Sequence, residues 1–327
     1  MRIMDWKHRM LATSLVALAA MWLVGPSVAK AQVVPGTGFK LTEAGDDFEN
    51  EAWEFIPNWP KASQNLNGDT QHPLGEANNS RWIESAYRGA PDIVRRVPTP
   101  PNGIPGSKGA MLLQTKYPGI PNMITRQQQQ DDLLSTMNNT VGSLSSSWTP
   151  SIVVRVYIRP WNEMEQRTGS SFGFRADCEG MMTKHDAPAG KFFGKKFSSR
   201  QVYDSYWPGF FIQYNCKASG QYDRDSAIIL IRSDELGRDL FGPTITEPGW
   251  WTLGMSFTPD GRVHYYASPG TDRLTQADYL TSQNPYGSRT DRVTTFFFNV
   301  VTQDDGKTMS TGWIVDDPEV FVLHRPQ

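Results

Sequence analysis

The last third of the chain consists of segments in which bulky and small residues alternate. They are rich in β-branched and aromatic side chains and cover residues 249–257, 262–267, 293–301 and 313–323. A repeat of two places alternate side chains on opposite faces of a strand, so each segment predicts a strand with one face on a core. Pro-Asp-Gly and Asp-Asp-Gly turns separate them. This pattern predicts an all-β protein of antiparallel strands.

The middle of the chain contains a further strand with two different faces. In residues 151–159, isoleucine and valine occupy one face, whereas Val153, Arg155, Tyr157 and Arg159 occupy the other. A polar and aromatic face suits a sheet surface that meets solvent or a ligand. Residues 109–114 predict a short strand, and the glutamine-rich stretch 126–135 suggests one or two turns of helix.

Residues 1–31 have the three parts of a secretory signal peptide. A basic start precedes an apolar stretch from Met10 to Val24, and Ala29-Lys-Ala31 forms a cleavage site. About 15 apolar residues are fewer than the roughly 20 that span a bilayer, which favours cleavage over an uncleaved anchor. We therefore expect a secreted or periplasmic protein without stable membrane insertion. A flexible lead-in over 32–45 would precede one domain over 46–325.

Composition narrows the classes of partner. The formal net charge of −2 gives no broad positive field for nucleic acid. The 11 tryptophans suit either stacking on sugars or ordinary core packing in a β protein. The two cysteines, Cys178 and Cys216, follow strand-like segments, and export to an oxidising compartment predicts one disulfide between them, with two free buried thiols as the alternative.

Three segments together resemble the concanavalin A-like, or laminin G-like, jelly-roll sandwiches of exported bacterial proteins. These are an Asp-Phe-Glu opening strand with a tryptophan at its end (Asp47 to Trp53), a Trp-x-x-Leu strand with a Pro-Asp-Gly hairpin (Trp250 to Gly261), and a closing Trp-Ile-Val-Asp-Asp strand (Trp313 to Asp317). The resemblance implies two antiparallel sheets with long loop insertions, in which opening strand 46–55 lies near closing strand 313–323. This superfamily includes lectins, binding modules, glycoside hydrolases and polysaccharide lyases, so the fold alone does not select a function.

The enzymes of the superfamily require particular residue sets. The Glu-x-Asp-x-x-Glu run of laminarinase-like hydrolases does not occur in this sequence. The alginate-lyase-like members place arginine, glutamine, histidine and tyrosine on one concave face, and the resemblance suggests Arg155, Gln213, His264 and Tyr266 as their counterparts. However, Asn215 stands where those lyases have histidine after Gln-x.

In a sandwich of this fold, a ligand would lie in a groove, and outward-facing residues of the central strands would form the floor of that groove. By alternation we expect that floor to contain the residues Arg155, Tyr157, Arg159, Gln213, Arg262, His264 and Tyr266. The loop 183–208, rich in cations and aromatics, would form one wall with Lys195, Lys196 and Trp207. Guanidinium groups match carboxylate or sulfate, which favours an anionic ligand.

No cofactor is implied by any complete motif, although Asp47, Asp316 and Asp317 could hold a structural calcium ion through oxygen ligands. Taken together, these features favour an exported protein that binds a polysaccharide or a cell-surface glycan, acidic polysaccharide included. The alternative is a lyase that cleaves a uronic-acid polysaccharide by β-elimination.

Overall fold

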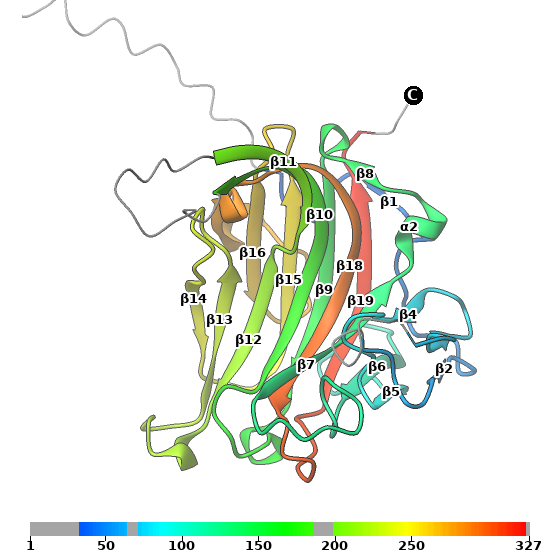
Figure 1. The fold of residues 1–327 in the computed structure, drawn as a ribbon, viewed down its shortest axis with the longest axis vertical. Coiled ribbons are helices and arrows are strands. Elements are labelled where there is room, and N and C mark those ends of the chain that lie inside the picture. Colours follow the sequence, from blue (N-terminus) through cyan, green and yellow to red (C-terminus); the bar gives the residue numbers. More distant parts are fainter. Residues whose placement is uncertain (1–32, 64–70, 186–198, 325–327) are drawn as a thin grey trace, which may run out of the picture. The chain divides into compact units, whose positions relative to one another are not determined.

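Two antiparallel sheets, A and B, pack face to face in the computed structural model, which describes residues 33–63, 71–185 and 199–324 (Figure 1). Aromatic side chains from both sheets fill the space between them. The ring of Phe172 in sheet B lies 5.6 Å from that of Trp313 in sheet A, and Phe210 meets Tyr265 edge-on at 5.3 Å. The predicted all-β jelly-roll sandwich is confirmed.

Sheet A has eight strands. Its path runs through β17 (Tyr279–Gln283), β16 (Val263–Pro269), β15 (Gly249–Phe257), β9 (Pro150–Ile158), β19 (Trp313–Val322), β6 (Gly109–Gln114) and β5 (Ile93–Pro98), with β1 (Phe39–Lys40) paired to β19. The strands predicted by period-two patterning over 109–114, 151–159, 249–257, 262–267 and 313–323 therefore all belong to this sheet.

Sheet B has eleven strands. Its path runs through β14 (Leu240–Ile245), β13 (Ser226–Arg232), β12 (Gly209–Asn215), β10 (Ser171–His185), β18 (Arg289–Gln303), β7 (Gln128–Ser135), β4 (Trp82–Glu84), β3 (Glu76–Ala77) and β2 (Phe55–Ile56), with β11 (Ser199–Tyr206) paired to β10 and β8 (Leu144–Ser145) to β18. One short helix, α2 (Met137–Thr140), follows β7. Single 3-10 turns occupy Ser146–Trp148, Trp161–Glu163, Lys217–Ser219, Gln276–Asp278 and Pro285–Gly287.

The predicted opening strand over 46–55 is wrong. Side chains of Asp46, Asp47 and Asn50 each accept the backbone N–H two residues further on, and such bonds turn the chain instead of extending it. The pairing with the closing strand is made earlier, by β1. The expectation of proximity holds in part, because the Asp46 N–H donates to the carbonyl of Pro318 and Asp47 lies close enough to Asp317 to influence its pKa.

The glutamine-rich stretch is also a strand rather than a helix. β7 pairs with β18 along one edge and with β4 along the other. Ladder hydrogen bonds on both sides override the helix propensity of glutamine, because backbone groups buried in a sheet must be paired. This strand carries Gln130, Asp132 and Leu134 onto the outer face of sheet B.

The predicted disulfide is absent, and both cysteines are free and buried. β10 and β12 pair antiparallel as expected, but the two cysteines lie at opposite ends of the pair. The N–H of Cys216 donates to Oγ1 of Thr168, which precedes Cys178 by ten residues along the chain. At about 3.3 Å per residue that offset is roughly 30 Å, whereas a disulfide requires Cα atoms within about 7 Å.

The segment predicted as a flexible lead-in lies across the outer face of sheet A. The carbonyl of Val33 accepts a hydrogen bond from Ser256 at 2.7 Å, and the N–H of Gly36 donates to Ser151 at 3.2 Å. A side chain at Gly254 would collide with Pro35 at 2.7 Å, so this glycine allows the segment to approach the sheet. The predicted signal peptide lies outside the described residues. Within them, the structure contains no helix of the length and apolarity that crossing a membrane requires.

Candidate functional site

The outer face of sheet A carries most of the residues predicted to form a groove floor. Arg155 and Tyr157 lie on β9, and His264 and Tyr266 lie on β16, with β15 between the two strands. This face is covered rather than open. Only 7% of Arg155, 7% of His264 and none of Tyr266 is exposed. Val34 and Tyr279 pack over this end of the sheet, against Tyr266.

The polar groups of that face are used within the protein. Arg155 Nη1 forms an ion pair with Glu319, and Arg159 Nε donates to the carbonyl of Gly312 at 2.8 Å. His264 Nε2 lies 3.0 Å from the Thr258 hydroxyl, and burial lowers the pKa of the imidazole. Arg262, which precedes β16, reaches Ser282 at 3.4 Å. Each of these groups thus contacts another segment of sheet A or of its edge.

The residues suggested for a lyase are not brought together. Gln213 lies on β12, on the outer face of sheet B, whereas Arg155, His264 and Tyr266 lie on the outer face of sheet A. The described ends of the predicted loop 183–208 are strands, because β10 and β11 pair from Cys178–Tyr206 to His185–Ser199. Lys195 and Lys196 lie outside the described residues, and Trp207 follows β11 directly.

The three calcium candidates do not form a metal site. The described part of the chain has no group of three or more carboxylate, histidine or cysteine side chains placed to hold a metal ion. Asp316 instead accepts hydrogen bonds from Ser107 and from the backbone of Asp317, both at 2.9 Å. Its burial raises the pKa to about 7.

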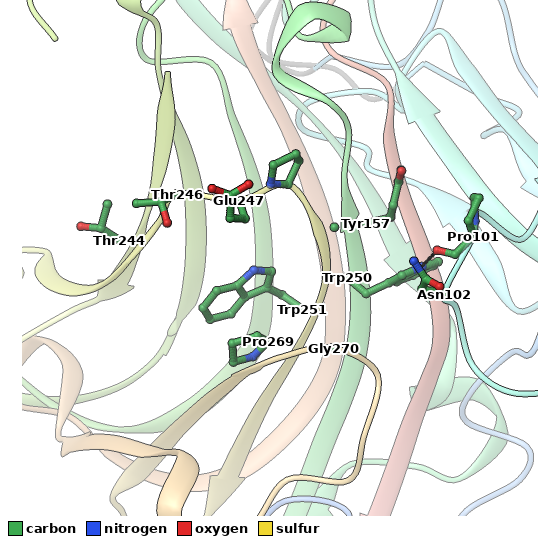
Figure 2. A pocket seen from close by; sticks show the side chains of 12 residues that line it. Pro101, Asn102, Tyr157, Thr244, Thr246, Glu247, Trp250, Trp251, Pro269 and Gly270 are labelled. Atoms are coloured by element: carbon green, nitrogen blue, oxygen red, sulfur yellow. Dashed lines mark hydrogen bonds between the residues drawn. The ribbon is translucent and has the colours of Figure 1, made fainter. Parts of the chain in front are cut away.

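One cavity of about 580 Å³ wraps around the start of β15. Figure 2 shows Trp250 beside Tyr157 and Asn102, and Trp251 beside Pro269, on the two sides of the strand. Trp250 is 5% exposed and its indole N–H donates to the carbonyl of Pro101, while Trp251 is 8% exposed. Neither indole presents an open face, so this cavity offers no tryptophan surface on which a ligand could stack.

A second cavity, the sheet B groove, lies on the outer face of sheet B and measures about 570 Å³. Its floor comes from the neighbouring strands β7, β18 and β10, and its rim from the segment after β4, from the end of β11 and from the residue that follows β11. The residues that line it are Ser85, Tyr87, Arg88, Gln130, Asp132, Leu134, Arg175, Asp177, Asp204, Ser205, Trp207, Thr295 and Phe297.

Arg175 and Trp207 form the best-defined contact of the sheet B groove. Arg175 Nε and Nη2 donate to the carbonyl of Trp207 at 3.1 and 2.7 Å. The guanidinium lies 5.6 Å from the Phe211 ring and 5.5 Å from the Phe297 ring, within cation–π range. Burial lowers the pKa of Arg175 to about 10, so the group remains a cation at neutral pH. Trp207 is therefore anchored through its backbone while 45% of the residue stays exposed.

Asp177 lies beside this pair on β10. Its side chain lies close enough to the Trp207 side chain for this neighbour to oppose the rise in pKa to about 6 that burial causes. Its Oδ1 is buried without a hydrogen-bond partner among the described residues. Trp207 is thus held through its backbone by Arg175, and its side chain lies beside Asp177.

Asp132 occupies the far side of the groove, on β7. Asn299 donates to it at 2.6 Å and Gln130 at 3.0 Å, and burial raises its pKa to about 6. Asn299 is fully buried against Gly173, where a Cβ would meet the Asn299 amide oxygen at 2.4 Å. Glycine at 173 therefore allows the amide to fit between the strands and reach Asp132.

The two carboxylates do not form a hydrolase pair. Asp132 is opposite Asn299 in the ladder, Asn299 is opposite Gly173, and Asp177 follows four residues later. Two strand spacings of about 4.8 Å and four residues of about 3.3 Å place their Cα atoms about 16 Å apart. Glycosidases hold their two carboxylates roughly 5–9.5 Å apart.

The alternation of residues in the first half of β10 is a sequence signal for this site. In the strand that leads to Cys178, Phe172, Phe174 and Ala176 alternate with Gly173, Arg175 and Asp177. The first set lies in the core, and the second lies on the outer face. Period two thus marks Arg175 and Asp177 as outward residues of a central strand, but Trp207 becomes a neighbour only through the hairpin of β10 and β11.

Comparisons with known proteins give only distant structural likenesses. No protein-family model and no curated protein matches the chain. An alginate lyase from Pseudomonas aeruginosa matches at 10% identity and a TM-score of 0.38, covering 72% of this chain and 86% of the lyase. A marine alginate lyase from Zobellia galactanivorans matches at 10% identity and a TM-score of 0.35, covering 74% of this chain and 95% of the lyase. The luminal domain of VIP36 bound to calcium and mannose matches at 10% identity and a TM-score of 0.37, covering 88% of this chain and 91% of that domain. At these scores the likenesses carry no argument about function.

Proposed function

We propose that the protein binds a carbohydrate chain in the sheet B groove, with a sugar ring stacked on Trp207. One observation carries this proposal: Trp207 is 45% exposed beside the groove although two hydrogen bonds from Arg175 hold its backbone. An exposed side chain usually moves freely. Fixing a large aromatic ring in advance lowers the entropy cost of binding a ligand to it.

The surroundings of Trp207 suit a sugar better than a wholly apolar ligand. An indole offers a flat apolar face, which matches the C–H face of a pyranose. Gln130, Asp132 and Asp177 line the groove with amide and carboxylate groups that hydrogen bond to hydroxyls. Tyr87, 64% exposed, is a second aromatic side chain on the lining.

The groove favours binding over catalysis. Its lining contains no histidine among the described residues, and Arg175 directs its Nε and Nη2 hydrogen bonds to the carbonyl of Trp207. A lyase needs a cation free to neutralise the uronate and a positioned group to remove the proton. With the predicted signal peptide, the proposal describes an exported carbohydrate-binding protein.

A glycan array with matched tryptophan variants tests this proposal. Trp207→Ala removes the stacking surface, and Trp59→Ala serves as the control because Trp59 is 60% exposed and lines neither cavity. We expect Trp207→Ala to weaken binding about 30-fold, the effect of losing a central aromatic contact of about 2 kcal/mol. Trp59→Ala should bind like the wild type. Equal binding by Trp207→Ala and the wild type would contradict the proposal.

A further inference from the structure

We propose that the ligand of the sheet B groove is a neutral, hydroxyl-bearing glycan and not a uronic-acid or sulfated polysaccharide. This inference rests on the proposed function and concerns the chemical class of the ligand. It replaces the expectation of an anion, which relied on arginines of the outer face of sheet A. Those arginines lie on the other sheet, where Arg155 pairs with Glu319 and Arg159 with Glu163, whereas Arg262 is exposed.

The charge of the groove opposes an anionic ligand. Two arginines, Arg88 and Arg175, line it together with three aspartates, Asp132, Asp177 and Asp204. The lining therefore carries an excess of negative charge at neutral pH. A carboxylate or sulfate on a sugar would approach these aspartates in a partly buried site, where repulsion between like charges is screened less than in water.

The cation at the centre of the groove is partly occupied. Arg175 Nε and Nη2 donate to the carbonyl of Trp207, and its guanidinium lies within cation–π range of the rings of Phe211 and Phe297. A fork of two parallel hydrogen bonds through this Nε edge would require Arg175 to leave Trp207, which leaves an anion only the Nη1 end of the group. Binding an anion in this way would release the stacking residue that binding needs.

One acceptor of the groove has no donor. Asp177 Oδ1 is buried without a partner among the described residues, and a carboxylate oxygen accepts hydrogen bonds but does not donate them. A sugar hydroxyl placed at this point beside Trp207 would supply that donor, whereas an ionised carboxylate or a sulfate in its place has no hydrogen to give. Leaving a buried acceptor unpaired is unfavourable, so a hydroxyl is favoured over a charged group at this position.

The test uses polysaccharides that differ only in charge. A panel of uronic-acid polysaccharides is compared with the carboxyl-reduced product of each, in which a CH₂OH group replaces the carboxylate at unchanged linkage. Affinity electrophoresis measures the binding of the wild type, Trp207→Ala and Trp59→Ala to both members of each pair. We expect the reduced member to bind about tenfold more tightly than its uronic-acid parent, as one unfavourable charge contact would give.

The outcomes separate the ligand class from the function itself. Preferential binding of the reduced members that is lost in Trp207→Ala supports the inference. Equal or tighter binding of the uronic-acid members, also lost in Trp207→Ala, would overturn the ligand class but retain the groove as the site. Binding that persists in Trp207→Ala, or no binding of any member, would overturn the proposed function and the ligand class with it.

A variant that removes one negative charge from the groove provides a second measurement. A purely structural role of Asp177 would not change the preference between charged and neutral ligands. Asp177→Asn keeps an acceptor oxygen and removes the negative charge, and Asp223→Asn is the control because Asp223 is exposed and lies outside the groove. Asp177→Asn should shift the ratio of the affinity for uronic-acid members to the affinity for reduced members about three- to tenfold towards the uronic-acid members. An unchanged preference in Asp177→Asn, with Asp223→Asn as reference, would show that the groove charge does not select the ligand.

Discussion

Asp316 should destabilise the protein at neutral pH, and its replacement by asparagine should relieve this effect. Asp316 is fully buried on β19, and burial, with the charge of Asp317 beside it, raises its pKa from 3.8 to about 7. The folded chain therefore holds this proton more tightly than the unfolded chain. The stability that the neutral carboxyl contributes is complete below about pH 4 and is lost as the pH rises through about 7.

The magnitude follows from the size of the shift. A rise of about three pH units corresponds to about 4 kcal/mol as an upper limit, and we expect about 2–4 kcal/mol because relaxation around a buried charge reduces the effect. Asparagine is neutral at every pH and can retain the contacts with Ser107 and with the backbone of Asp317. Asp316→Asn should therefore gain stability relative to the wild type between pH 4 and pH 8.

Urea unfolding of both proteins at the two pH values, in the presence of a chelator, measures this difference directly. The expected result is a variant more stable than the wild type at pH 8 and similar to it at pH 4. A variant that is less stable at pH 8 would refute the reasoning, because it would show that the Asp316 carboxylate is ionised and stabilised in the folded protein.

Three other substitutions or treatments have defined expectations. Arg175→Gln should weaken glycan binding about tenfold in titration calorimetry, because Trp207 loses its charged anchor; unchanged affinity would contradict the anchoring role. A reducing agent should not shift the unfolding midpoint, and Cys178 and Cys216 should react with a maleimide only after unfolding, since both thiols are free and buried. Lys61→Met should cost about 3–5 kcal/mol in urea unfolding, because it leaves buried carboxylates unpaired; a loss below 1 kcal/mol, roughly that of a surface pair, would contradict this.

The strands could be predicted wherever the alternation of side chains is strong. β9, β15 and β19 carry β-branched or aromatic residues at period two, and each lies where the pattern placed it. β7 could not be recognised in this way, because glutamines and aspartates supply no apolar alternation. Its neighbours β18 and β4 determine its conformation, and pairing between distant segments is not visible in a local pattern.

The candidate site was predicted less well because facing outward is not the same as being exposed. Alternation correctly assigned Arg155 and His264 to the outer face of their strands. It gave no indication that residues after Val33 would cross that face, or that Gln213 belongs to the other sheet. Likewise, the strands bearing the two cysteines do pair, but their register keeps the sulfurs apart. Alternation defines the face of the sheet on which a side chain lies. The pairing register of the strands and the covering of that face by other segments depend on the whole fold.

The most direct test of the account is a crystal structure of the protein with an oligosaccharide identified on the array. We predict a sugar ring stacked on the indole of Trp207 and a sugar hydroxyl within hydrogen-bond distance of Asp177 Oδ1, with Arg175 still bonded to the carbonyl of Trp207. A glycan bound instead at the start of β15, against Trp250 and Tyr157, or anywhere outside the sheet B groove, would contradict the central claim.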